Sequence, residues 1–266
     1  WLGCNGNRLK RELRMKHLLF GAAALALLTG CNPEDAPAAG TDVALTELSV
    51  RGGNPANAAS ALAAMSLADS GAGTLTFANK SVDGANATFS DIAVAGETGI
   101  SAGSLVFEGL DMVDGKATFG KLSLNNIALN GEDSGDGEAS IGNIEIVNPS
   151  PELSSWLAAT LNGQQAEFPA AETVKFDSWS INNIAANFDD DDATGTFGLD
   201  KIEIREMGGL KAKLATISGI SLTGTEGGSD SPFSVKLGSL AMTNVDAKFV
   251  KALQENSGDQ EALLSA

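Results

Sequence analysis

The chain has 266 residues, of which 17 are basic, 34 are acidic and 43% are hydrophobic, with a formal net charge of −17. So acidic a surface repels phosphate backbones, which excludes nucleic acid as an expected partner. One His, two Cys and no Tyr are present, so no zinc site can be assembled from His and Cys, and we expect neither a metal nor a cofactor.

The first segments in chain order are targeting signals. A basic start at Lys16 precedes an apolar run over residues 18–28. The run has the length of a signal-peptide core and is too short for a permanent membrane span. We therefore expect residues 15–30 to be a cleaved signal peptide, and residues 1–14 to be an upstream over-translation outside the fold.

The apolar run ends in Leu28-Thr29-Gly30-Cys31, which resembles the lipobox of bacterial lipoproteins cleaved by signal peptidase II. The resemblance implies cleavage before Cys31 and acylation of both its thiol and its new amino terminus. At about 0.8 kcal/mol per buried CH₂, such chains anchor a protein without a transmembrane helix. Asn32 follows, not the Asp that resembles an inner-membrane retention signal in enteric bacteria, which favours the outer membrane over the inner.

The mature chain offers no activated catalytic group. Five basic residues and one acidic residue precede Cys31, which leaves 12 basic and 33 acidic residues and a net charge of −21. Cys31 is consumed by lipid and no His remains, which excludes a Cys nucleophile and a His-dependent triad. The string Gly99-Ile100-Ser101-Ala102-Gly103 matches the hydrolase nucleophile elbow, but no His follows it. We expect no enzyme; a hydrolase with a carboxylate pair is the alternative left open.

A repeated pattern follows a Pro-, Ala- and Gly-rich segment, residues 31–44, which is expected to be a flexible tether. The pattern is apolar, two residues, apolar, one residue, apolar, and it occurs at Leu45/Leu48/Val50, Phe89/Ile92/Val94, Phe107/Leu110/Met112, Phe119/Leu122/Leu124, Leu124/Ile127/Leu129, Ile141/Ile144/Ile146, Phe176/Trp179/Ile181, Leu199/Ile202/Ile204, Ile217/Ile220/Leu222 and Leu237/Leu240/Met242. Alternation predicts strands, and the two-residue gap, which reverses side-chain parity, indicates a β-bulge or a corner between strands.

Turn residues connect these predicted strands. Val82-Asp83-Gly84 and Val113-Asp114-Gly115 each precede an alternating run, and Asp-Gly is a favoured two-residue hairpin turn. Asn130-Gly131 follows another such run. Hairpins favour an antiparallel arrangement, and a β-helix or solenoid is the alternative, because units of about 20 residues also suit one solenoid coil.

Short helices interrupt the strands. Asn54-Pro55 and Ser150-Pro151 each combine a capping residue with Pro at the first helical position. A third helix is expected over residues 246–255. All should cover one face or end of the sheet. Since the first two helices each follow a strand and precede further strands, we expect an internal duplication with halves at 45–147 and 148–266.

Acidic residues cluster in two predicted turns, residues 132–138 and 189–192. Oxygen-rich loops can bind calcium, but neither turn has the EF-hand spacing, and acidic turns on so acidic a protein are commonly only solvated. We assign no metal site and leave calcium binding at these turns open.

The strand rhythm over most of the mature chain resembles that of β-groove proteins of the AsmA and lipopolysaccharide-transport type, which implies an apolar groove for acyl chains. We expect a mainly β fold of repeated short antiparallel strands and hairpins with two or three short helices. The expected function is a non-enzymatic, lipid-anchored envelope protein that binds a lipid or an envelope protein. The alternatives are a structural or adhesive β-protein without a ligand pocket and, third, a carboxylate-pair glycan hydrolase.

Overall fold

The computed structural model describes residues 44–94, 100–130, 138–161, 166–189, 193–226 and 232–246. Residues 42–245 form one compact unit. Six predicted features lie wholly or almost wholly outside the described residues: the over-translated residues 1–14, the signal peptide, Cys31 with its tether, Gly131, the two acidic turns and the third helix.

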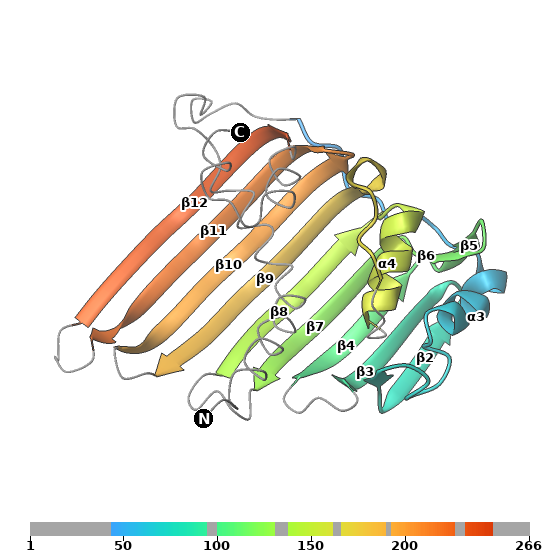
Figure 1. Cartoon of the computed structure of the whole chain (residues 1–266), viewed down its shortest axis with the longest axis horizontal. Helices are drawn as coiled ribbons and strands as arrows, with labels where there is room; N and C mark the ends of the chain where they lie inside the picture. Colours follow the sequence, from blue (N-terminus) through green and yellow to red (C-terminus); the bar gives the residue numbers. More distant parts are fainter. Residues whose placement is uncertain are drawn as a thin grey trace, which may run out of the picture. The chain divides into compact units, whose positions relative to one another are not determined.

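The described part of the chain is mainly β, and its sheet follows chain order (Figure 1). The ten strands of the sheet are β1 (Leu75–Thr76), β2 (Asn79–Asp83), β3 (Asn86–Val94), β4 (Ile100–Glu108), β7 (Lys121–Asn130), β8 (Glu138–Val147), β9 (Lys175–Asp189), β10 (Ala193–Gly208), β11 (Lys211–Glu226) and β12 (Pro232–Asp246). Their order is β1-β3-β4-β7-β8-β9-β10-β11-β12, and β2 also pairs with β3. Pairing is antiparallel from β1 to β11. The antiparallel prediction is confirmed, and the solenoid alternative is wrong.

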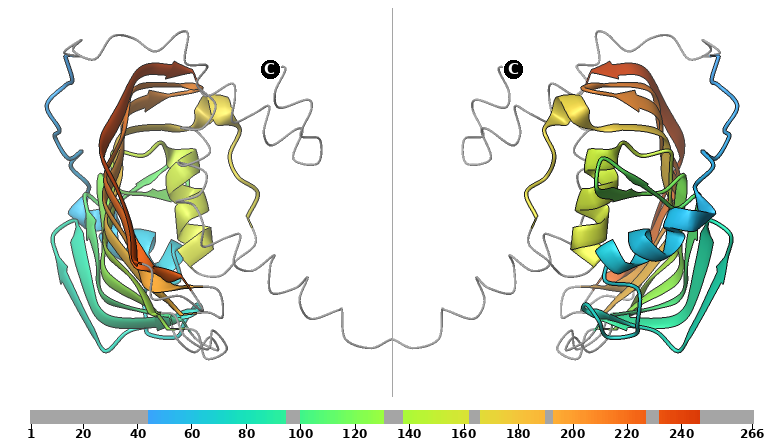
Figure 2. Two further views of the ribbon diagram at one scale, coloured as in Figure 1. Left: turned by 90° about the vertical axis from the view of Figure 1, so that its left-hand side faces the viewer. Right: turned by 90° about the vertical axis from the view of Figure 1, so that its right-hand side faces the viewer.

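Helices and a hairpin accompany the first strands of this sheet. β5 (Asp111–Val113) and β6 (Lys116–Thr118) form a separate two-stranded sheet. Helices α3 (Pro55–Ala64) and α4 (Pro151–Leu161) pack on it and lie on the concave side of the curved main sheet (Figure 2). A short 3₁₀ helix, η2 (Ala171–Thr173), precedes β9. Since β8 pairs with β9, the two halves of the predicted duplication share one sheet.

A transverse row of backbone irregularities explains the repeated sequence pattern. Between β3 and β4, for example, Ser90 pairs with Ser104 and Ile92 with Ala102, while the intervening Asp91 and Gly103 are not paired. The same gap recurs in every pair as far as β11. In alternate strands the residue in the gap is left-handed, with φ between 53° and 69°: Asp91, Asn126, Asn183 and Gly219. Asn, Asp and Gly tolerate this conformation best. The predicted reversal of side-chain alternation is therefore a kink inside each strand, and the kinks of neighbouring strands lie side by side across the sheet.

The first predicted strand unit, Leu45/Leu48/Val50, is wrong. Residues 44–54 are extended but pair with no strand, and they cross the convex side of the sheet (Figure 2). Arg51 anchors this segment: its backbone N–H donates to Asn148 Oδ1 (2.7 Å) and its guanidinium donates to Phe119 O (2.8 Å). A Cβ at Gly109 or Gly120 would collide with Arg51 O. Alternating apolar residues therefore form no strand here, because the segment crosses the sheet instead of joining its edge.

The two predicted hairpin turns are not equivalent. Val113 pairs with Lys116, which leaves Asp114 (φ 49°) and Gly115 (φ 75°) as a two-residue turn, as predicted. In the other hairpin, however, Asp83 pairs with Asn86, so that the loop is Gly84-Ala85. The prediction there is wrong by one residue, because Asp83 belongs to β2. The hairpins also differ in their place in the fold, since β2 and β3 belong to the main sheet and β5 and β6 do not.

Both described helices begin where predicted. The Asn54 side chain accepts a hydrogen bond from the Ala56 N–H (3.1 Å), and Pro55 opens α3. Helix α4 opens at Pro151, and the Ser150 hydroxyl before it donates to Thr173 O (2.8 Å). Ser150 therefore ties the start of α4 to η2.

Candidate ligand-binding face

The kinked strands give the sheet one face that is apolar over four successive rows. The two rows that flank the kink are Phe89, Leu105, Leu124, Ile144, Ile181, Ile202 and Ile217, and Ile92, Ala102, Ile127, Ile141, Ile184 and Leu199. The rows beyond them, which include Ile146 and Ile204 on one side and Leu129 and Phe197 on the other, are also apolar. Two residues separate the flanking rows, a spacing that would place them on opposite sides of a regular strand. The kink reverses the alternation of side chains, so both rows point to the same side. We call this side the apolar face.

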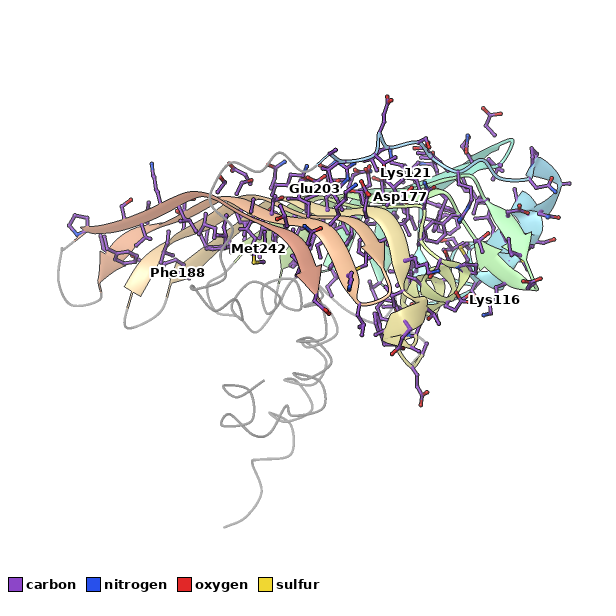
Figure 3. The ribbon with its side chains drawn as sticks, turned by 90° about the horizontal axis from the view of Figure 1, so that it is seen from above. Lys116, Lys121, Asp177, Phe188, Glu203 and Met242 are labelled. Atoms are coloured by element: carbon purple, nitrogen blue, oxygen red, sulfur yellow. The ribbon has the colours of Figure 1, made fainter. Side chains whose placement is uncertain are left out.

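Side chains of known position fix which side of the sheet is apolar. Figure 3 shows Phe188 of β9 and Met242 of β12 on the side of the helices, and Lys121, Asp177 and Glu203 on the opposite side. The apolar face is thus the concave one. The convex side, which we call the polar face, carries the charged residues and the crossing segment 44–53.

An amide ladder runs across the polar face beside the kink. Its row is Ser90, Ser104, Asn125, Asn143, Asn182, Lys201 and Ser218. Asn182 Nδ2 donates to Asn143 Oδ1 (3.0 Å), and Asn143 Nδ2 donates to Asn125 Oδ1 (2.7 Å). Asn125 Nδ2 in turn donates to Ser104 Oγ (3.0 Å). Asn143 and Asn125 each donate and accept, so the ladder links four neighbouring strands and holds them in register.

Charges on the polar face are largely neutralised by one another. Lys121 Nζ lies 3.2 Å from a carboxylate oxygen of both Glu108 and Glu145. Burial lowers the pKa of Lys121, but hydrogen bonds to these two carboxylates outweigh it and raise the pKa overall. The Thr46 N–H donates to Glu206 Oε1 (2.6 Å), and this bond, with the ammonium group of Lys213, lowers the pKa of Glu206. These pairs give the carboxylates of Glu108, Glu145 and Glu206 structural partners.

Beneath the helices the apolar face is a filled core. The rings of Phe77, Phe89, Phe107 and Phe119 form a chain of edge-to-face contacts, with centroids 4.8, 6.4 and 5.3 Å apart. Phe107 and Phe119 are fully buried, as are Leu62 and Met65 at the end of α3. This part of the face matches the expectation for a structural β-protein.

Exposure of the apolar face rises towards β12. In Figure 1 the two described helices lie over β2–β8 and not over β10–β12. Phe197 and Leu222, in the outer row of β10 and β11, are half-buried. On β12, Val235, Leu237 and Leu240 are 57, 48 and 43% exposed. Exposed apolar residues gathered on one sheet face are a feature of ligand- or partner-binding surfaces.

The residues singled out from the sequence are mostly remote from this face. Cys31 and most of the acidic turns 132–138 and 189–192 lie outside the described residues. Ser101 of the hydrolase-like string lies within β4, opposite Ala128, and not on a strand-to-helix turn. Over the described ranges no group of three metal-ligating side chains is found, and no described helix is long and apolar enough to span a membrane.

The amide ladder and the left-handed row were missed at the sequence level. Their signal is the repeated string Leu124-Asn125-Asn126-Ile127 and Ile181-Asn182-Asn183-Ile184. In both strings the first Asn belongs to the ladder and the second is left-handed. Two consecutive Asn residues between the apolar residues of a strand, where the pattern has its two-residue gap, would have predicted both features.

Comparison with known proteins adds no further guide to the site, because no family model, no curated protein and no solved structure matches the chain. The lipoprotein and β-groove resemblances stay predictions.

Proposed function

We propose that this chain is a non-enzymatic, lipid-anchored protein of the cell envelope that binds the acyl chains of a lipid on the apolar face of β9–β12. The anchor is Cys31, and the outer membrane is its proposed location. The observation that carries the proposal is the continuation of the apolar rows beyond the described helices, as far as the exposed Leu237 and Leu240 of β12.

Energetics support an apolar ligand. Burial of apolar surface stabilises by about 25 cal/mol per Å², so a ligand that covers exposed Leu and Val side chains gains affinity without any specific polar contact. The four apolar rows carry no charge, so an acyl chain laid along them desolvates no ionised group. A headgroup, being polar, would remain at the rim.

Binding is best tested with a matched pair of substitutions. Leu240 precedes Met242 by two residues, so the two side chains share the apolar face, whereas Ala241 between them points to the other side. In a chain that begins at Asn32 and carries no acyl group of its own, Leu240→Asp should weaken the binding of a fluorescent fatty acid at least about tenfold, the equivalent of 1.4 kcal/mol. Ala241→Asp should leave it unchanged.

Lipid that co-purifies with this chain should also appear in native mass spectrometry. A ligand-free spectrum, together with no fatty-acid binding, would contradict the proposal and favour a structural or adhesive role.

The lipid anchor is tested separately. Cys31→Ser should abolish the incorporation of labelled palmitate, and equal labelling of variant and wild type would contradict the lipobox assignment.

A further inference from the structure

In two strand pairs of this sheet, β4 with β7 and β8 with β9, an Asn and a Gly meet at the kink. A Cβ built on Gly103 of β4 would lie 3.2 Å from Asn126 Cβ, and one built on Gly142 of β8 would lie 2.9 Å from Asn183 Cβ. Asn126 and Asn183 are the left-handed residues of β7 and β9, the strands that follow β4 and β8 in the sheet. Each glycine thus leaves room for the Asn side chain of the next strand.

Strand β12 carries the glycine half of this arrangement. Gly238-Ser239 fills the parity gap between Leu237 and Leu240, as Gly103-Ser104 does in β4 and Gly142-Asn143 does in β8. A Cβ built on Gly238 would meet no atom within 4 Å, whereas a Cβ built on Gly103 or Gly142 would meet an Asn side chain. β12 is also the last strand of the described sheet (Figure 1). The position that an Asn from a following strand would fill is therefore empty.

We propose that the outer edge of β12 binds an extended strand of a partner protein. This strand runs antiparallel to β12 and carries the string apolar-Asn-Asn-apolar. Its second Asn is left-handed and lies over Gly238, and its first Asn continues the amide ladder at Ser239. Its apolar residues extend the apolar rows beside Leu237 and Leu240. This is binding by β-strand addition, in which main-chain hydrogen bonds give affinity and side-chain pockets give specificity.

The opposite edge of the described sheet offers no strand of this kind, so the proposed occupant is a strand of a different protein. β1 and β2 have two and five residues, against 15 in β12, and neither contains a left-handed residue. Two copies of β12 paired antiparallel would place Gly238 opposite Ser239, not opposite a left-handed Asn. A second copy of the chain therefore supplies no described strand that completes the row. The inference does not rest on lipid binding, because it concerns the edge of the sheet and not its face.

A peptide that copies β7 is the probe. Residues 121–130, KLSLNNIALN, labelled with a fluorophore, should bind the full mature chain in a fluorescence anisotropy titration. Gly238→Val should weaken binding at least tenfold, because its side chain occupies the place of the peptide's second Asn. Gly208→Val in the interior strand β10, where a built Cβ also meets nothing within 4 Å, is the matched control and should bind as the wild type does.

The peptide itself supplies a second test. Replacing its second Asn by Val, which disfavours the left-handed conformation, should abolish binding, and replacing it by Gly should retain most of it. Absence of wild-type binding, or equal binding by Gly238→Val and Gly208→Val, would overturn the proposal. So would a dimer of the wild-type chain, seen by light scattering, that Gly238→Val dissociates, because the occupant of the edge would then be a second copy.

Discussion

Strands β3, β4, β7 and β8 share their transverse rows with strands β9 to β12, but the chain completes the two regions differently. In the first region the strands have at most ten residues, and the chain leaves the sheet after β4 and after β8. The hairpin β5–β6 follows β4, and α4 follows β8. In the second region the strands have 15 or 16 residues and continue without interruption.

A second set of left-handed residues marks the place where the two regions diverge. Gly109 (φ 69°) and Asn148 (φ 52°) come directly after β4 and β8, whereas Glu206 (φ 51°) and Asn244 (φ 53°) lie inside β10 and β12. Asn148 and Glu206 occupy one row, since Val147, Ser178 and Arg205 are paired in the preceding one. At the same backbone kink the chain either turns away to build a covering layer or continues along the strand, and over the continuing strands the described residues form no such layer.

The largest difference between the regions is expected in the cost of removing an aromatic ring. Phe107 is fully buried between Phe89 and Phe119, so Phe107→Ala should lower the free energy of unfolding by about 3–5 kcal/mol. Phe197 is half-buried, and Phe197→Ala should cost about half as much. Urea denaturation measures both values, and equal losses would mean that the second region has a core as closed as the first.

The left-handed Asn residues should behave alike in both regions. Asn126→Val and Asn183→Val each force a β-branched residue into the left-handed conformation, which costs about 1–2 kcal/mol. Asn→Gly at the same positions relieves that strain and should cost less, although it removes the side chain above Gly103 or Gly142. Thermal unfolding of the four variants provides the comparison. If Val and Gly were tolerated equally, the kink would not depend on the left-handed residue.

The turn glycines provide a smaller effect, confined to the first region. Gly115 (φ 75°) and Gly84 (φ 59°) both adopt conformations that Val disfavours, and a Cβ at either meets no neighbouring atom. Gly115→Val and Gly84→Val should therefore destabilise by about 1 kcal/mol or more through the backbone alone. A neutral result at both positions in urea denaturation would show that these turns are loose loops.

The smallest effect is expected on the inner face of α4. Ser154 is fully buried, and no described group hydrogen-bonds its hydroxyl. Ser154→Ala should leave the free energy of unfolding unchanged or raise it by up to about 1 kcal/mol, because an unsatisfied hydroxyl is lost. Ser150→Ala, which removes the bond to Thr173 O, is the control and should destabilise. A clear loss of stability in Ser154→Ala would reveal a partner for that hydroxyl.

Sequence periodicity was sufficient for the fold class but not for the turn register or the two regions. The gap in Phe89/Ile92/Val94 predicts the parity change, because the burial of alternate residues is a local property of a strand. The alignment of Asp91 with Gly103 and Asn126 depends on the pairing of distant strands, which a single strand's sequence does not define. Leu45/Leu48/Val50 fits the same pattern and yet forms no strand, because its backbone is held by Asn148 and Glu206 side chains.

The candidate site could be predicted only in kind. The two helices contain few large apolar residues, which is consistent with partial cover of the sheet, but their position over β2–β8 follows from where the chain leaves the sheet. The exposed residues of β12 carry the same motif as the buried residues of β3. Exposure is set by the neighbouring elements and not by the motif, so the sequence alone does not distinguish the two.

The central claim, that the apolar face of β9–β12 binds acyl chains, is tested most directly by photolabelling. A fatty acid with a diazirine on its chain should be bound to the unacylated mature chain, irradiated, and located by peptide mass spectrometry. We expect labels on apolar-face residues of β11 and β12, such as Leu222, Leu237 and Leu240, and none on the polar-face residues beside them. Labels distributed equally over both faces, or found only around α3 and α4, would contradict it.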